Sequence, residues 1–301
     1  MNRRDLSGMA LMVAIGVFWG LNWPAVKIIL SEIPPWTLRA VGMSLGAVLL
    51  TILAIMMKQT LRLPHAERLT LIIAGLLTVL GFNVMTAFGQ LHTQTSTAAI
   101  IAFTMPMWAA ALSIAFLGEK PTIRRIASLA VGMSGLLVLV YEDVTGFFEQ
   151  PLGPAFMLGA ALSWAAGTVV LKSRIWSVKP IPQAAWMLGC SAVPGIIAAW
   201  VFEYDGNVVL PSSPVLALLV YHILFPMVIC YAAWSVLVAR LPASVAAMGT
   251  LLVPIVGVFS AGYFLGDELS WQKLTALALV LLSIVFTFAR ISDRPRPDKV
   301  S

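Results

Sequence analysis

Apolar residues run in long uninterrupted stretches along almost the whole chain of 301 residues. A helix that crosses the hydrocarbon core of a bilayer needs about 20 mostly apolar residues, because each residue adds only 1.5 Å of length. Ten stretches have this character, and short polar segments separate them. The pattern predicts ten membrane-spanning helices, over residues 6–26, 37–57, 69–91, 97–118, 124–141, 152–172, 181–202, 214–237, 243–265 and 271–289.

The fifth and tenth predicted spans are shorter than the others. The uncharged runs Ile126–Tyr141 and Leu274–Ala289 contain only 16 residues each. Basic side chains flank both runs and can extend the spans by reaching toward the lipid headgroups. Continuous apolar runs also exclude a membrane β-barrel, whose strands alternate in polarity.

Composition narrows the class of protein further. Hydrophobic residues make up 60% of the chain and charged residues 11%, less than half the share of about 25% in soluble domains. This excludes a soluble enzyme, a nucleic-acid-binding protein and a disordered chain. We therefore expect an all-α polytopic membrane protein with the lipid bilayer as its environment and no nucleic-acid partner.

Basic residues predict the orientation of the spans. With the N-terminus inside, 16 of the 19 lysines and arginines lie in inner loops and tails, and only Lys27, Arg39 and Lys273 lie outside. Cytoplasmic loops of membrane proteins carry such an excess of basic residues. The asymmetry predicts that both termini are cytoplasmic.

The chain also repeats itself at a nearly constant offset. An offset of 148 residues aligns landmarks of the fourth and ninth spans, and an offset of 145 aligns those of the first and sixth. The matched pairs are Ser96 with Ser244, Pro106 with Pro254, Glu119 with Asp267, Trp19 with Trp164 and Lys27 with Lys172. This predicts two five-helix repeats, residues 1–145 and 146–290, followed by a basic cytoplasmic tail at 291–301. Because five is odd, the second repeat enters the membrane from the opposite side, and such inverted repeats enclose a central cavity in many secondary transporters.

Specific residues add a family resemblance. The first span carries Phe18-Trp19-Gly20-Leu21-Asn22-Trp23, and Pro106 is followed by Leu117-Gly118-Glu119 and a glycine-rich helix. The second half repeats this as Pro254 followed by Leu265-Gly266-Asp267-Glu268. With these motifs the chain resembles the drug/metabolite transporter superfamily with two EamA domains, closest to the YddG-type amino-acid exporters, over residues 8–140 and 152–289.

The resemblance implies a fold and an activity. Spans 1, 3, 4, 6, 8 and 9 would line the cavity, and spans 5 and 10 would be peripheral. The implied activity is export of amino acids or related small metabolites across the bacterial inner membrane by alternating access. A drug or nucleotide-sugar carrier of the same superfamily is the alternative within this class. A channel and an intramembrane enzyme are alternatives outside it.

Ionisable residues within the spans are rare. His222 lies well inside its span, whereas Lys27 and Arg39 lie near span ends. His222 either binds substrate or carries a proton, or it is a neutral histidine bonded within the core. Asp267, like Glu119, falls in a predicted turn, where helix capping and local ion pairs explain it.

Neutral polar and aromatic residues give the remaining site candidates. Asn83, Thr86 and Gln90 share one face of the third span, which must therefore face a cavity or another helix. Tryptophans near span ends, among them Trp23, fit anchoring at the membrane interface. The predicted cavity residues are Trp19, Asn22, Asn83, Gln90, Trp108, Trp164 and His222. Pro106 and Pro254 are predicted either to act as hinges or to shape the cavity.

Motifs for chemistry are absent from the sequence. It contains no metalloprotease, nucleophile-elbow or phosphate-loop signature, so no catalytic residue, metal, cofactor or ATP-binding subunit is expected. Basic residues deep in the spans would favour a phosphate-bearing solute, and their absence favours a neutral or zwitterionic one. Because no carboxylate is embedded in the spans, we expect transport driven by the solute's own gradient and not by protons.

Overall fold

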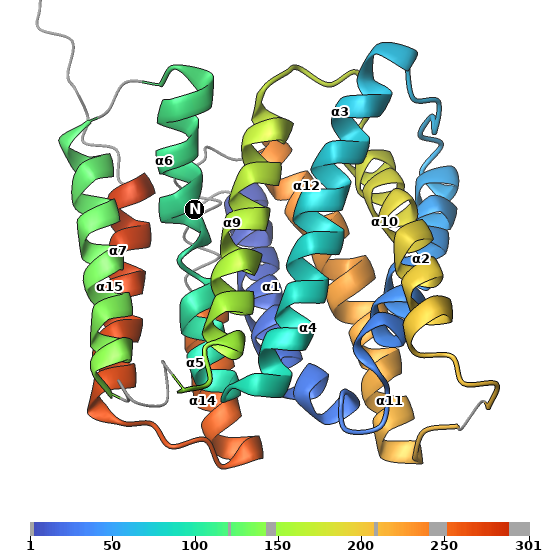
Figure 1. Cartoon of the computed structure of the whole chain (residues 1–301). Helices are drawn as coiled ribbons and strands as arrows, with labels where there is room; N and C mark the ends of the chain where they lie inside the picture. The colour runs from blue at the N-terminus through green and yellow to red at the C-terminus, as the bar shows by residue number, and fades with distance from the viewer. Residues whose placement is uncertain (1–2, 120–121, 143–148, 208–209, 241–251, 289–301) are drawn as a thin grey trace, which may run out of the picture.

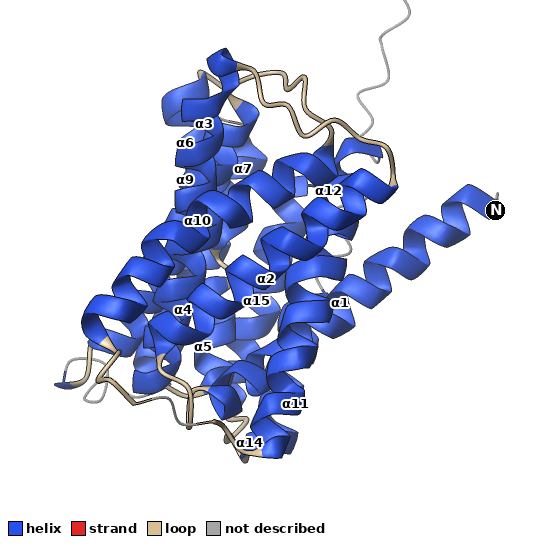
Figure 2. Ribbon diagram, turned by 90° about the vertical axis from the view of Figure 1, so that its right-hand side faces the viewer, coloured by secondary structure: helices blue, strands red, loops and turns tan. Residues whose placement is uncertain are grey.

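The computed structural model describes residues 3–119, 122–142, 149–207, 210–240 and 252–288, and over these residues it contains helices and no strand (Figure 2). The elements in chain order are α1 (Arg3–Ile29), α2 (Pro35–Met56), α3 (His65–Gly75), η1 (Leu76–Gly81), α4 (Phe82–His92), α5 (Thr95–Ala102), α6 (Met105–Leu117), α7 (Ile123–Glu142), α9 (Leu152–Lys172), α10 (Pro180–Phe202), α11 (Ser213–His222), η2 (Ile223–Cys230), α12 (Tyr231–Arg240), α14 (Leu252–Leu265) and α15 (Trp271–Phe288).

The helices agree with a multi-pass membrane protein. Within the described residues, seven helices are long and apolar enough to cross a bilayer. Three shorter apolar helices cover Ile126–Glu142, Leu252–Leu265 and Trp271–Phe286. Two of these are the spans that the sequence predicts to be short. The predicted ninth span begins at residues 243–251, which lie outside the described residues.

Two spans contain a widened π-helical turn. In the third span η1 connects α3 to α4, and in the eighth span η2 connects α11 to α12. Such turns shift the register of a helix face and occur often at functional sites. The fourth span is broken at Phe103–Thr104, directly before α6. Pro106 lies in the first turn of α6, where its missing backbone N–H costs nothing.

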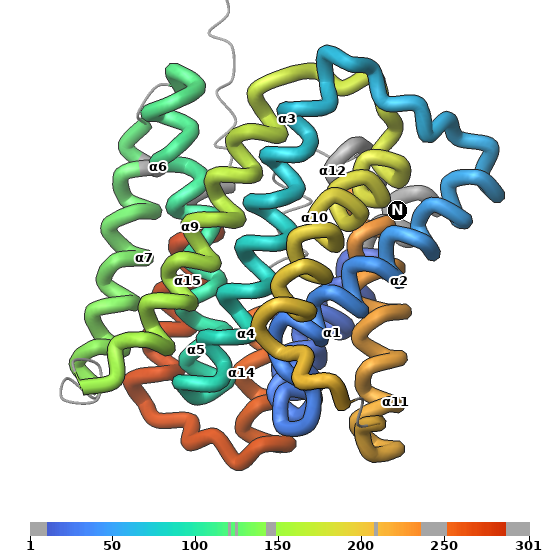
Figure 3. Tube along the Cα trace, turned by 45° about the vertical axis from the view of Figure 1, so that its right-hand side comes forward, coloured from blue at the N-terminus to red at the C-terminus, as the bar shows by residue number. Residues whose placement is uncertain are grey.

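The helices pack in pairs that join the two halves of the chain. α7 packs against α15 at one edge of the bundle, and α2 packs against α10 at another (Figures 1 and 3). Between them, α1 packs against α14, and α9 packs against α6. Gly16 and Gly20 allow α1 to lie close to α14, since an added Cβ at Gly20 would lie only 2.4 Å from the Cβ of Val256.

The repeated Leu-Gly-acid motif ends a helix in each half. Gly118 follows α6 with a φ of 65°, and Gly266 follows α14 with a φ of 73°. This left-handed conformation is favourable only for glycine and commonly closes the last turn of a helix. The acidic residue that comes next is thereby placed just beyond the helix end.

Carboxylates from one half bind helix starts of the other half at one end of the bundle. The backbone N–H of Ser96, in the first turn of α5, donates to Asp267 at 2.7 Å. The first backbone N–H groups of α2 donate to Glu203 at 2.8 and 2.7 Å. The hydroxyl and backbone N–H of Ser212, directly before α11, donate to Glu32 and lower the pKa of its carboxyl. Free N–H groups and the helix dipole both stabilise an anion at these positions.

Candidate functional site

A chain of polar side chains, three buried and one half-buried, connects α1, α2, α4 and α11. We call Asn22, His222, Arg39 and Thr86 the polar chain. His222 Nδ1 lies 2.7 Å from Asn22 Oδ1, and Arg39 Nη1 lies 3.5 Å from His222 Nε2. Arg39 Nη2 donates to the hydroxyl of Thr86 at 3.4 Å. His222 is fully buried and Arg39 is 2% exposed, so protein groups rather than solvent surround this charge.

The partners of His222 assign its protonation. A guanidinium can only donate, so His222 Nε2 accepts from Arg39 and Nδ1–H donates to Asn22. This is a neutral imidazole, and a second positive charge beside Arg39 would be disfavoured by repulsion. Gly42 of α2 provides the space for this ring, since an added Cβ would lie 3.2 Å from His222 Nε2.

An aromatic cluster lies next to the polar chain. It consists of Trp19, Phe82, Trp164, Tyr231 and Trp234, from α1, α4, α9 and α12. Trp19 is at its centre, with ring centroids 6.5 Å from Trp164, 5.8 Å from Tyr231 and 6.1 Å from Trp234. The Trp19 and Trp164 rings meet edge to face at 89°, a favourable arrangement for aromatic pairs.

Asn83 connects the aromatic cluster to the polar chain. Its Nδ2 donates to the hydroxyl of Tyr231 at 3.3 Å, and its backbone carbonyl accepts from the Thr86 hydroxyl at 2.9 Å. Trp19 Nε1 donates to the carbonyl of Pro226 in η2 at 3.2 Å. The widened turn η2 thus lies directly between His222 and the aromatic cluster, and it contributes to both.

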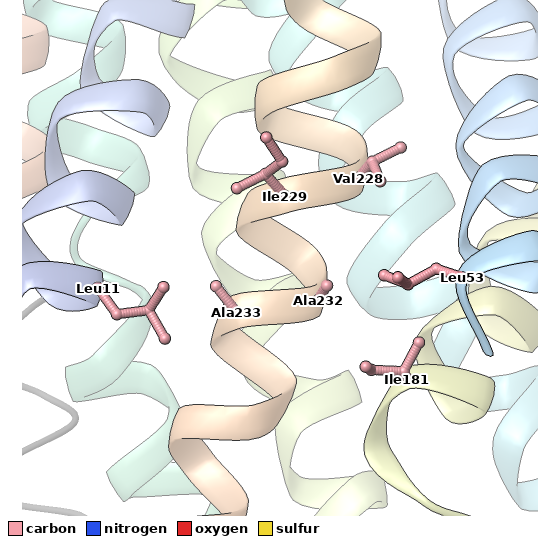
Figure 4. A pocket seen from close by; sticks show the side chains of 7 residues that line it. All are labelled: Leu11, Leu53, Ile181, Val228, Ile229, Ala232 and Ala233. Atoms are coloured by element: carbon pink, nitrogen blue, oxygen red, sulfur yellow. The ribbon is translucent and has the colours of Figure 1, made fainter. Parts of the chain in front are cut away.

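An open apolar pocket lies near the aromatic cluster. Its volume is about 310 Å³, and only apolar side chains line it (Figure 4). They come from α1, α2, α10, η2 and α12 and are Leu11, Leu53, Ile181, Val228, Ile229, Ala232 and Ala233. Leu11 and Ala233 pack in the same hydrophobic cluster as Trp19 and Trp234. The apolar pocket and the aromatic cluster therefore lie close together in the bundle.

Comparisons with known proteins identify the family. The model of the EamA-like transporter family matches residues 6–141 and 151–289. The chain belongs to the EamA-like transporter family. It is a transporter and not an enzyme, and it carries two EamA-like segments.

Relatives match over nearly their whole length. A "Probable amino-acid metabolite efflux pump" of Escherichia coli is 28% identical, with 94% of each chain covered. The "Uncharacterized transporter YoaV" of Bacillus subtilis is 24% identical, with 93% of this chain and 97% of the relative covered. A crystal structure at 19% identity matches with a TM-score of 0.66 over 91% of this chain and 95% of the solved one, which shows a common fold.

The EamA-like transporter brings most of the predicted site residues together. Trp19 and Trp164 meet in the aromatic cluster, Asn22 and His222 meet in the polar chain, and Asn83 joins the two. The prediction that Asn83, Thr86 and Gln90 face the protein interior is confirmed, since these side chains are 6%, 4% and 2% exposed.

Gln90 and Trp108 lie apart from this group. The Gln90 side chain accepts from Thr95 at 3.5 Å, and its backbone carbonyl accepts from Lys27 near the end where carboxylates cap the helices. Trp108 Nε1 donates to Thr104 at 3.2 Å, one turn earlier in the chain. Of the predicted hinges, Pro106 lies beside the break before α6. Pro254 lies in the first described turn of α14.

Arg39 is the residue that sequence analysis missed. Arg39 lies near the end of its span, as expected, in the second turn of α2, but its guanidinium is buried beside His222. Its position near the start of α2 suggested an interfacial residue, and nothing local in the sequence indicates the contacts with α4 and α11. The interfacial assignment of Trp23 is wrong, since its side chain is 7% exposed and packs against Phe103.

The polar chain predicts a measurable coupling between Asn22 and His222. Replacing Asn22 with Leu leaves the buried Nδ1–H of His222 without an acceptor and should lower the free energy of unfolding by about 1–3 kcal/mol. The double variant with His222→Leu should lose less free energy of unfolding than the two single variants lose together, because the unpaired donor is gone. Unfolding titrations in mixed micelles measure all three variants.

The matched control is Asn207→Leu, because Asn207 is an exposed asparagine outside the polar chain. We expect it to change the free energy of unfolding by no more than about 0.5 kcal/mol. Strictly additive effects of Asn22→Leu and His222→Leu would show that the bond between these side chains does not contribute.

Proposed function

We propose that this EamA-like transporter is a secondary transporter that exports amino acids or related small metabolites by alternating access. The observation that carries the proposal is the buried guanidinium of Arg39 beside an aromatic cluster, at the meeting place of helices from both EamA-like segments. Such a combination suits a solute with one charged end and one apolar end. The name of the Escherichia coli relative supports an amino-acid-like solute. We place the protein in a bacterial inner membrane with both termini in the cytoplasm, on the distribution of its basic residues.

Paired features support ten spans arranged as two inverted repeats, residues 1–145 and 146–290. A widened turn occurs in the third and eighth spans, and a left-handed glycine ends α6 and α14. The packing of α1 against α14 has its counterpart in that of α9 against α6, and α2 with α10 and α7 with α15 pair with their own equivalents. If each helix is replaced by its equivalent in the other half, every one of these helix pairs becomes another pair of the same set, as an inverted repeat requires.

The capping carboxylates provide a gate. Asp267, Glu203 and Glu32 each fix a helix start of the opposite half at one end of the bundle. Opening that end means breaking these bonds together while the helices move as rigid bodies. Water replaces each broken bond at little net cost, which suits a contact that must form and break in every cycle.

The solute's own gradient drives the transport. Among the described residues the buried charged side chains are Arg39, Glu67 and Lys273. Glu67 lies in the first turn of α3 and accepts from the Ser177 hydroxyl at 2.6 Å, far along α3 and α4 from the polar chain. His222 stays neutral beside Arg39. Within the described part of the chain, no group near the proposed site is thus suited to carry a proton.

Cysteine labelling tests the ten-span topology. In a background without Cys190 and Cys230, single cysteines at Glu149 and Arg240 should react with an impermeant maleimide from opposite sides of the membrane. Glu149 should react from outside. If both positions react from the same side, the inverted ten-span arrangement is contradicted.

Transport in proteoliposomes tests the activity. Labelled amino acids should exchange in counterflow, and Trp19→Ala or Trp164→Ala should raise the half-saturation concentration. Each change can also cost about 3–5 kcal/mol of stability through the void it leaves, so unfolding must be measured alongside flux. Trp271→Ala, at an exposed tryptophan, is the control.

The same vesicles test the driving force. A pH gradient alone, with the membrane potential clamped, should produce no accumulation above equilibrium. Accumulation that disappears in His222→Ala would contradict gradient-driven transport and identify His222 as a proton carrier. Flux without saturation or counterflow would instead indicate a channel.

A further inference from the structure

We propose that Arg39 binds the carboxylate of the transported solute. The inference rests on the proposed transport function and specifies the chemistry that the site recognises. It starts from an unbalanced charge: no carboxylate of a described residue pairs with Arg39, although the side chain is 2% exposed. An arginine inside a membrane protein normally pairs with an acid or faces a functional pathway.

The other two buried charged side chains of the described residues, Lys273 and Glu67, have close partners within the protein. Lys273 lies 3.9 Å from Glu142 and donates to the carbonyl of Glu268 at 2.8 Å. Glu67 accepts from the hydroxyl and backbone N–H of Ser177 at 2.6 and 3.1 Å. Glu67 Oε2 and Arg39 Nε both lack a hydrogen-bond partner, but Glu67 lies in the first turn of α3, whereas Arg39 belongs to the polar chain beside the aromatic cluster.

The hydrogen-bond donors of Arg39 are only partly used. A guanidinium carries five N–H donors in a planar fork. The contacts of Arg39 with His222 and Thr86 are long, at 3.5 and 3.4 Å, and its Nε has no hydrogen-bond partner. A carboxylate can accept two parallel bonds from such a fork, and these bonds are shorter and stronger than the present contacts.

The surroundings of Arg39 suit a single negative charge. His222 is neutral, Asn22 and Thr86 carry no charge, and no second cation joins the polar chain. One guanidinium balances one carboxylate, whereas a phosphate monoester carries up to two charges. The single cation therefore favours a carboxylate over a phosphate.

The aromatic cluster and the apolar pocket determine how the bound solute is oriented. Thr86, Asn83 and Tyr231 lead from Arg39 to the ring of Trp19, and two residues that line the apolar pocket, Leu11 and Ala233, pack in one hydrophobic cluster with Trp19 and Trp234. A solute with its carboxylate at Arg39 would place its apolar side chain among the aromatic rings. A solute that reaches the site from the apolar pocket would turn its carboxylate toward Arg39.

Matched ligands test the proposal without any mutation. The probes are L-phenylalanine and L-phenylalaninamide, which differ at the carboxyl group, and binding is measured by the shift in thermal unfolding of the whole protein in detergent. The wild type should bind the amino acid about 10- to 100-fold more tightly than the amide, as charge-assisted bonds predict. Inorganic phosphate should compete weakly.

Variants then assign the preference to Arg39. Arg39→Gln should lower the affinity for L-phenylalanine to that for the amide, and Arg39→Lys should restore part of the difference. Arg62→Gln, which removes an exposed arginine, should leave the ratio of the two affinities unchanged.

The outcomes separate this inference from the transport proposal. Equal affinity for the amino acid and the amide, or an unchanged ratio in Arg39→Gln, would overturn the role of Arg39 while saturable flux would still support transport. If neither probe binds while labelled phenylalanine is transported, recognition lies elsewhere and the inference is again overturned. Absence of flux and binding for all twenty amino acids would contradict both proposals. If Arg39→Gln does not fold, the affinities of the wild type for L-phenylalanine and L-phenylalaninamide still test whether the site recognises a carboxylate.

Discussion

Burial of the Arg39 guanidinium is the constraint around which the centre of the protein is organised. A charged group among membrane helices has no water to solvate it, so the protein must supply its partners. Two other helices do so here, through His222 and Thr86, and Asn22 of a third helix bonds to His222. Gly42 of α2 leaves room for the imidazole of His222, which α11 carries. The positions of α1, α2, α4 and α11 are thus tied to one charge.

Hydrogen bonding also explains why widened turns accompany the site. The turn η2 begins directly after His222 and contains Pro226, whose carbonyl accepts from Trp19. A regular helix through this segment would point a different face at α1. The turn follows His222 directly and supplies the carbonyl that holds the central tryptophan. Rigid placement of both groups is what recognition of an amphipathic solute requires.

Sequence predicted the elements well and the site only in part. Long apolar runs place the spans to within a few residues, because hydrophobic length alone decides where a helix can cross a bilayer. Trp19, Trp164, Asn22, Asn83 and His222 were found because polar and aromatic residues are conspicuous inside such runs. Their meeting in one place depends on contacts between segments up to about 200 residues apart, as between Asn22 and His222.

The position of a residue along its helix predicted its surroundings wrongly where packing between helices buries the side chain. Arg39 lies within two turns of a helix start, which is typical of an interfacial residue, yet α4 and α11 enclose it. Trp23 has the position of a membrane anchor and instead packs against Phe103. The turn η2 contains Pro226, which disturbs a regular helix, but η1 contains no proline and no local signal that predicts it. Asp267 behaved as predicted for a turn residue, but the helix it caps belongs to the other half of the chain.

The central claim is that a solute binds between the aromatic cluster and Arg39. A crystal structure with bound L-4-bromophenylalanine tests it most directly, because the anomalous signal of bromine marks the end of the side chain. The account predicts a bromine peak among Trp19, Trp164 and Tyr231 or at the edge of the apolar pocket, with the carboxylate bonded to Arg39. A bound molecule whose carboxylate lies elsewhere, or a bromine peak outside the aromatic cluster and the apolar pocket, would contradict it.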